Sequence, residues 1–199
     1  MDRKTERYKE AILISKILLL NFRPDIAGGT DNVIAILFDM NRLWEELIYR
    51  RLKKEETYFG VTVHRQQSKS FWQPLESDRP KNIKPDIVIT NEGGSQTIII
   101  DTKWKLVDDL LPGDADLKQM YVYNLFWSCK KSILLYPANS IDHNDGHYFN
   151  FKDGKELHSG CVVYAFSILN EDHVLSATLG HDLMVALWNE NEIKPDNKN

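Results

Sequence analysis

Cysteine is scarce in this chain, which has two, Cys129 and Cys161, among 199 residues. They lie far apart in the sequence, and neither belongs to a pair with metal-ligand spacing. This excludes a disulfide framework and a zinc site built from cysteine pairs, and a reducing cytoplasm is the easier fit. Histidine offers no replacement, because the spacing of His143, His147 and His158 matches no helix or ribbon ligand pattern.

Long apolar segments are also missing. The most apolar N-terminal run, residues 11–20, is interrupted by Ser15 and Lys16 and is too short to span a bilayer. No signal peptide, internal repeat or domain boundary is recognisable. We therefore expect a cytoplasmic protein without a membrane partner that folds as one domain over residues 1–199. Within it, residues 1–35 are expected to form a helical lead-in, and residues 190–199 a disordered tail.

Positive charge is not in excess, since the formal net charge is −4. A negative total does not favour a nucleic-acid partner, but it says little where charges are segregated. The basic residues fall into three clusters: Arg50, Arg51, Lys53 and Lys54; Arg65, Lys69, Arg79, Lys81 and Lys84; and Lys130 and Lys131. Each cluster alone is typical of a solvated helix end or loop, and together they are suited to line a phosphate-facing surface.

What the chain does have is a pair of expected strands around which the rest is organised. They cover residues 84–90 and 97–104, and the second is almost entirely β-branched up to Asp101. The linker between them is rich in turn residues and suits a hairpin. If the strands pair, Asp86 can lie beside Asp101. Asp101 and Lys103 then project from one face, because side chains alternate along a strand.

Two carboxylates this close repel each other unless a cation lies between them. Mg²⁺ fits, because it takes oxygen ligands, usually one or two carboxylates, and completes its shell with water and phosphate oxygens. Lys103 would orient or activate the attacking water, or neutralise the charge that develops on phosphorus. The pattern indicates a phosphodiesterase, although an ordinary hairpin with a polar solvated face fits the same residues.

Further helices and strands are expected on both sides of this pair. The expected helices cover residues 5–22, 41–54, 116–129 and 181–189. The expected strands cover residues 58–64, 132–136 (ended by Pro137) and 161–169, with a polar loop over 138–147 and a hairpin over 148–157. At least one of Phe71 and Trp72 is expected in the core, although exposed aromatic residues among basic ones can stack on bases.

Gln119 and Tyr123 lie four residues apart and share one face of the helix expected after the Lys103 strand. Two alternatives to a functional role are open. Asp116 and Gln119 have the spacing of a capping box, so Gln119 can simply close the helix start. Tyr123 can be a core tyrosine with its hydroxyl satisfied.

Glu45 and Glu46 lie beside the apolar stripe of the helix expected over residues 41–54. As ordinary surface residues they would form pairs with Arg50 and Arg51, one helical turn further on.

Three stretches together resemble a known family. They are Phe38-Asp39-Met40-Asn41-Arg42-Leu43-Trp44-Glu45; Pro85-Asp86 with Ile100-Asp101-Thr102-Lys103-Trp104-Lys105; and Gln119-Met120-Tyr121-Val122-Tyr123 with Leu134-Leu135-Tyr136-Pro137. The middle stretch looks like the PD-(D/E)XK nuclease motif. The three, in this order over roughly residues 10–170, resemble the C-terminal nuclease domain of McrC, the cleavage subunit of McrBC 5-methylcytosine-specific restriction systems. Trp44 stands where the family has phenylalanine.

The resemblance implies an α/β (α+β) fold, a restriction-endonuclease-like mixed β-sheet flanked by helices. It implies an Mg²⁺-dependent DNA endonuclease, with Mn²⁺ as a substitute, that acts in phage defence. Asp86 and Asp101 would be the metal ligands, Glu45 would reach the metal or its water, and Lys103 would act on the water or the transition state. Gln119 and Tyr123 match the Gln-x-x-x-Tyr pattern that RecB-like nucleases place near the metal and phosphate.

The resemblance also implies partners. These are double-stranded DNA and a McrB-like AAA+ motor driven by GTP, although the N-terminal region by which family members dock into the motor is missing here. The chain itself has no Walker-type phosphate loop. Because cutting both strands needs two active sites, a homodimer on DNA is a further hypothesis. The alternatives are a repair nuclease of the same superfamily and a non-catalytic DNA-binding or assembly module of the same fold.

Overall fold

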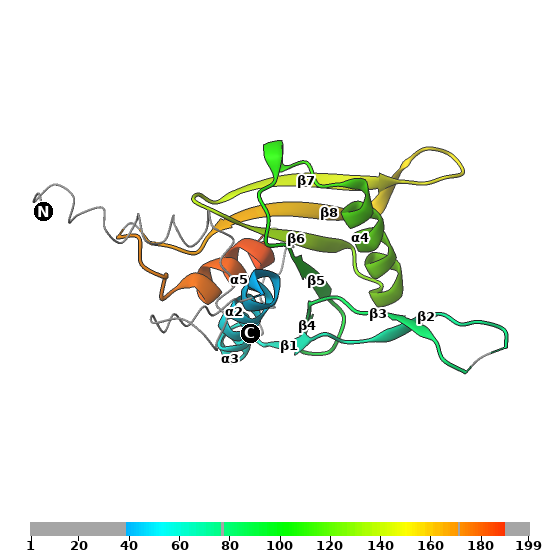
Figure 1. The fold of residues 1–199 in the computed structure, drawn as a ribbon, viewed down its shortest axis with the longest axis horizontal. Coiled ribbons are helices and arrows are strands. Elements are labelled where there is room, and N and C mark those ends of the chain that lie inside the picture. Colours follow the sequence, from blue (N-terminus) through cyan, green and yellow to red (C-terminus); the bar gives the residue numbers. More distant parts are fainter. Residues whose placement is uncertain (1–38, 77, 171, 190–199) are drawn as a thin grey trace, which may run out of the picture. The chain divides into compact units, whose positions relative to one another are not determined.

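A mixed sheet of six strands, in the order β1-β4-β5-β6-β8-β7, forms the centre of the described structure (Figure 1). The computed structural model describes residues 39–76, 78–170 and 172–189, all of which belong to one unit, residues 39–199. The strands are β1 (Val61–Arg65), β4 (Ile87–Asn91), β5 (Thr97–Thr102), β6 (Lys131–Ala138), β7 (Asp142–Phe149) and β8 (Glu156–Ser167). A separate two-stranded ribbon consists of β2 (Lys69–Trp72) and β3 (Lys81–Ile83).

The predicted hairpin is present as the antiparallel pair β4 and β5, in which Ile87 lies opposite Ile100. Its turn contains Gly93 and Gly94, both with positive φ, a conformation that side chains with a Cβ rarely adopt. From β5 the chain crosses through α4 (Asp114–Trp127) to β6, which pairs parallel to β5. Parallel strands need such a crossover connection, and a helix commonly provides it.

Helices cover both faces of the sheet. On one face, α2 (Met40–Lys53) and α5 (Leu179–Asn189) enclose an apolar cluster that includes Trp44, Ile48 and Leu183. On the other face α4 encloses a second cluster with Met120, Tyr123 and Trp127. The α/β architecture with a mixed sheet flanked by helices therefore agrees with the predicted fold class. Because alternate residues of β4 and β5 feed the two clusters, both strands are buried on both faces.

Several element predictions were wrong. Residues 58 and 59 belong to a short helix, α3 (Glu56–Phe59), and β1 begins only after Gly60, which ends α3 with a positive φ. Residues 142–147, predicted as a loop, begin β7, an edge strand that is exposed and polar. An exposed edge strand is held by backbone hydrogen bonds to a single neighbouring strand and needs no buried apolar face. Its sequence therefore lacks the apolar alternation by which other strands are predicted. The hairpin predicted over residues 148–157 is present, with Phe149 opposite Glu156, but its second strand does not end at residue 157 and continues to residue 167 as β8.

Pro137 does not end β6, which continues to Ala138. Pro137 still lies opposite Phe166 of β8, whereas the pairing with β5 stops at Leu135. A proline is tolerated where no neighbouring strand needs its missing N–H. The expectation that at least one of Phe71 and Trp72 lies in the core is also wrong, because 51% and 56% of these residues are exposed.

The predicted helix over residues 5–22, the lead-in over 1–35 and the tail over 190–199 lie outside the described residues. No helix in the described part of the chain has the length and apolar character needed to cross a membrane.

Candidate active site

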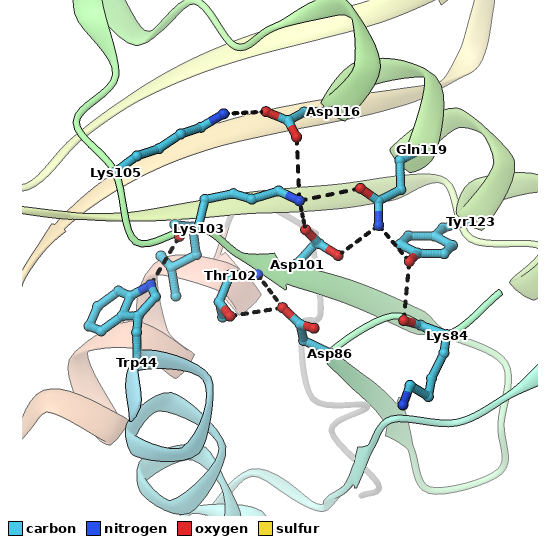
Figure 2. A network of polar contacts seen from close by, with 11 residues as sticks. Trp44, Lys84, Asp86, Asp101, Thr102, Lys103, Lys105, Asp116, Gln119 and Tyr123 are labelled. Carbon is cyan, nitrogen blue, oxygen red and sulfur yellow. Dashed lines mark hydrogen bonds and ion pairs between the residues drawn. The ribbon is translucent and has the colours of Figure 1, made fainter. Parts of the chain in front are cut away.

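Asp86 and Asp101 meet where β4 begins and β5 ends. Continuing the register of Ile87 with Ile100 by one residue places Asp86 opposite Asp101. Asp86 Oδ2 accepts hydrogen bonds from the backbone N–H of Thr102 (2.7 Å) and from Thr102 Oγ1 (2.8 Å), as Figure 2 shows. These bonds fix Asp86 against the end of β5, while its Oδ1 has no hydrogen-bond partner among the described residues.

Burial raises the pKa of both carboxyl groups. For Asp101, which is 3% exposed, burial and then the charge of Asp86 raise the pKa to about 6, against the opposing effect of Lys103. For Asp86, burial also raises the pKa, although the hydrogen bonds from Thr102 lower it. Two buried acids that disfavour each other's ionisation are typical of a site that binds a cation or handles protons.

The Lys103 ammonium faces this pair and is held on three sides (Figure 2). Its Nζ lies 2.6 Å from Asp101 Oδ2, 3.3 Å from Asp116 Oδ1 and 3.3 Å from Gln119 Oε1. Asp101 Oδ2 is buried and accepts no hydrogen bond of good geometry within the described structure, so its contact with Lys103 is an ion pair. Burial alone would lower the pKa of Lys103, but Asp101 and Asp116 raise it above its usual value.

Gln119 and Tyr123 reach the site from the face of α4 that packs on the sheet. Gln119 Nε2 donates to Tyr123 Oη (2.7 Å) and lies 3.3 Å from Asp101 Oδ1. The hydroxyl of Tyr123 in turn donates to the backbone carbonyl of Lys84, at 3.1 Å. The amide of Gln119 therefore links the carboxylate, the ammonium and the tyrosine.

The alternative interpretations of these two residues fare differently. The capping box is wrong: α4 begins at Asp114 with Gly113 as its N-cap, and no side chain caps it. Tyr123 is 3% exposed with a satisfied hydroxyl, which agrees with the core-tyrosine interpretation. Burial in the apolar cluster raises the pKa of Tyr123, so the phenol stays neutral and contacts the site through Gln119.

Glu45 projects from α2 toward the end of β1. Glu45 Oε1 accepts from Arg65 Nε (3.0 Å) and Gln66 Nε2 (2.7 Å), both on or just after β1, and not from Arg50 or Arg51. It is Glu46 that pairs with Arg50 one turn later, and Glu46 also contacts Arg65.

A pocket of about 530 Å³ reaches the site from the side of Asp86. Its lining combines the start of α2, the end of β1 and the β4–β5 pair; it consists of Asp39, Asn41, Arg42, Glu45, Arg65, Gln66, Asp86 and Thr102. Glu45 and Asp86 thus line the same pocket, and the charge of Glu45 contributes to the raised pKa of Asp86. In the described part of the chain no three His, Cys, Asp or Glu side chains form a group spaced for a metal.

The donors nevertheless fit a hard divalent cation. Asp86 Oδ1 and Asp101 Oδ2 are carboxylate oxygens without a hydrogen bond from the described residues, and both belong to carboxyl groups whose pKa is raised. Mg²⁺ is commonly held by one or two carboxylates with water in its other positions. The two aspartates would therefore hold it directly, whereas Glu45 is already bound to Arg65 and Gln66.

Asp116 is the main residue of the site that the sequence did not point to. Its carboxylate bridges Lys103 and Lys105, with Oδ2 2.7 Å from Lys105 Nζ. Burial opposes ionisation, but the two lysines lower the pKa of Asp116 below its usual value. Asp116 lies three residues before Gln119, a spacing that puts both on one helix face, so this signal was available.

Comparison with known proteins identifies the family. The family described as "McrBC 5-methylcytosine restriction system component" matches residues 1–137. The chain belongs to this family. No curated protein matches this McrBC component. Among solved structures it is similar to one from Thermococcus gammatolerans, described as a refined half-complex from a tetradecameric assembly of McrB AAA+ hexamers with bound McrC, with a TM-score of 0.54 and 18% identity. The match covers 95% of this McrBC component but 40% of the other chain, so at this identity it supports the fold.

Proposed function

We propose that this McrBC component is an Mg²⁺-dependent DNA endonuclease, the cleavage subunit of a McrBC-type modification-dependent restriction system. The observation that carries the proposal is the convergence of Asp86, Asp101 and Lys103 at the junction of β4 and β5. Two buried carboxylates beside a charged lysine form a donor set for a divalent cation next to a group that can act on water. The family match supports the restriction-system context.

Each residue has a task in this proposal. Bound at Asp86 and Asp101, Mg²⁺ or Mn²⁺ supplies Lewis-acid polarisation of the phosphate and lowers the pKa of water. Lys103 orients the attacking water and stabilises the negative charge that builds up on the phosphate oxygens in the transition state. Gln119 fixes the position of the Lys103 ammonium relative to the Asp101 carboxylate through hydrogen bonds to both, and Tyr123 fixes the Gln119 amide. Glu45 fixes the pocket wall through Arg65 and Gln66.

A motor partner is part of the proposal. In the similar solved structure, McrC is bound to McrB AAA+ hexamers. We extend this to the present chain as coupling to a McrB-like AAA+ GTPase, with double-stranded DNA as substrate. Cutting both strands would bring together two copies of the chain on DNA.

The test is plasmid cleavage by the purified chain in Mg²⁺ or Mn²⁺, with and without the cognate motor subunit and GTP. We expect cleavage by the wild type and its loss in Lys103→Ala, with Lys118→Ala as the control. Lys118 lies on α4 as well, but its side chain is 79% exposed and, among the described residues, forms an ion pair only with exposed Asp114.

Three outcomes have different meanings. Cleavage without the motor identifies a nuclease that works alone, and cleavage only with the motor and GTP identifies a coupled restriction subunit. No cleavage in any condition, with Mn²⁺ still bound in calorimetry, contradicts the proposal and favours a non-catalytic module of the same fold.

A further inference from the structure

The ribbon formed by β2 and β3 carries large apolar side chains into solvent. Phe71 and Trp72 are 51% and 56% exposed, and the whole of β2 is exposed on both faces. In Figure 1 the ribbon projects away from the six-stranded sheet, with which it shares no pairing. An isolated two-stranded ribbon is marginally stable, and exposed aromatic residues on one call for a partner.

The ribbon is fixed at its base. Lys69 Nζ donates to the backbone carbonyl of Phe126 at 2.6 Å and lies 4.6 Å from the ring centroid of Trp127. The rings of Phe71 and Phe126 are 5.8 Å apart, and Trp127 Nε1 donates to Gln67 just before the ribbon. These contacts tie β2 to the end of α4, so the ribbon has a defined direction relative to the sheet.

Charge distinguishes the ribbon from the rest of the chain. Residues 65–84 contain five Lys or Arg and two Asp or Glu, in a chain whose formal net charge is −4. Lys81 is exposed, and its side chain forms no hydrogen bond or ion pair with another described residue. It lies directly opposite Trp72 in the ribbon, so an ammonium and an indole are cross-strand neighbours.

The pairing is also irregular at this point. Ser70 lies opposite Asn82 and Trp72 opposite Lys81, so Phe71 is the extra residue of a bulge. A bulge increases the local twist and re-aims a side chain, and bulges are frequent beside active sites.

The ribbon leads straight into the active site. β3 ends at Ile83, and the next residues are Lys84, whose carbonyl accepts from Tyr123, then Pro85 and Asp86. A molecule whose phosphate lies at Asp86 and Asp101 would therefore bind close to the residues at which the ribbon ends. A basic ribbon with exposed aromatic residues is complementary to DNA, and two-stranded β-ribbons enter DNA grooves.

We propose that the β2–β3 ribbon contacts the DNA duplex next to the scissile phosphate, with Lys81 on a phosphate and Phe71 and Trp72 against the bases and sugars of a groove. The inference rests on the proposed nuclease function, because it takes DNA as the molecule at the carboxylates. Basic side chains contribute affinity through counterion release, which depends on salt, whereas aromatic contacts contribute affinity that depends on it little.

The experiment measures binding of the full chain to a short fluorescein-labelled DNA duplex by anisotropy, in EDTA and over a series of salt concentrations. We expect Phe71→Ala with Trp72→Ala to weaken binding about fivefold or more without changing the salt slope. We expect Lys81→Gln to reduce the slope of log affinity against log salt by about 1. Thermal unfolding of each variant is the measurement that checks whether it remains folded.

The matched controls are Tyr58→Ala and Lys54→Gln. Both residues are exposed and lie beyond the end of α2 that is opposite to the pocket. We expect them to bind within about twofold of the wild type.

Because EDTA removes divalent metal, the assay is independent of cleavage. Ribbon variants that bind like the controls, a wild type that binds no duplex, or a defect confined to single-stranded DNA each overturn the ribbon contact, even if plasmid cleavage is intact. Weakened duplex binding by the ribbon variants, together with a wild type that cuts nothing, keeps the ribbon contact and removes the nuclease.

Discussion

At the scale of single residues, the most informative one is Asp116. It contacts neither of the two aspartates that would hold a metal, yet it holds Lys103 from the side opposite Asp101. Lys105 neutralises its other oxygen, so Asp116 shares one negative charge between two lysines. Asp116 is therefore a positioning residue for the lysine.

We expect Asp116→Asn to reduce the rate of plasmid nicking about tenfold, because Lys103 loses one of its two ionic partners and a small misplacement of a reacting group is costly. The KM for DNA should change little, and the rate should depend on pH differently, since the charge of Asp116 raises the pKa of Lys103. Steady-state nicking over a pH series measures both effects.

The control is Asp114→Asn, two residues earlier on the same helix. The side chain of Asp114 is 89% exposed, and its ion pair with exposed Lys118 is the only one it forms within the described part of the chain. If this variant loses as much activity as Asp116→Asn, the role assigned to Asp116 is contradicted.

At the scale of elements, α4 acts as a support for β5, the strand that carries Asp101. It packs its apolar residues on β5 and β6 and turns Gln119 and Tyr123 toward the site. Tyr123 also bonds the carbonyl of Lys84, which precedes β4. One helix therefore fixes both strands of the carboxylate pair.

We expect Tyr123→Phe to lower the free energy of unfolding by about 1 kcal/mol, because a buried hydroxyl that satisfies the Lys84 carbonyl and Gln119 is lost. The cleavage rate should fall several-fold, since Gln119 then loses the shortest of its three hydrogen bonds and keeps only the longer contacts with Lys103 and Asp101. Urea unfolding and nicking assays give the two values.

Tyr121→Phe provides the comparison. Tyr121 is half-buried on the same helix and packs against Tyr148, with ring centroids 5.0 Å apart, but its hydroxyl has no hydrogen bond to another described residue. Equal losses in both variants would mean that the hydroxyl of Tyr123 has no special role.

The sequence predicted well those elements whose signal is local. Asp86 and Asp101 belong to adjacent strands joined by a short turn, so their register followed from a few residues. β7 could not be found in this way, because a polar edge strand has no apolar alternation. The prediction that Pro137 ends β6 was wrong because the pairing with β5 stops at Leu135, so no partner on that side needs the missing N–H of Pro137. For Glu45 the helical spacing offers Arg50 and Arg51 as the alternative to a site role, whereas its partner Arg65 comes from β1, 20 residues further along the chain. Tertiary contacts of this kind leave no periodic signal.

At the scale of the whole molecule, the buried carboxylates affect stability through pH. The pKa of Asp101 is about 6 in the folded protein and 3.8 as a free side chain, so the folded state holds the proton more tightly. The unfolding free energy therefore falls as the pH rises from about 4 to about 6, because the unfolded state releases the proton first. Asp86 acts in the same direction.

We expect Asp101→Asn to be more stable than the wild type at pH 7 in EDTA, by about 1–3 kcal/mol, because the amide carries no charge to bury. The difference should disappear near pH 4. Urea unfolding at several pH values tests this, with exposed Asp78→Asn as the control. A variant less stable than the wild type at pH 7 would show that the ion pair with Lys103 outweighs the burial of charge.

The position of the Lys103 ammonium has one more consequence, which concerns folding in the absence of a divalent cation. Because this side chain already sits against Asp101, the site carries an internal counter-ion, and the polypeptide can fold in a compartment poor in free cations. If the protein has the proposed function, a chelator would therefore inactivate it reversibly without unfolding it, in contrast to small domains that need a metal to fold. Binding of the cation would then be a step separate from folding.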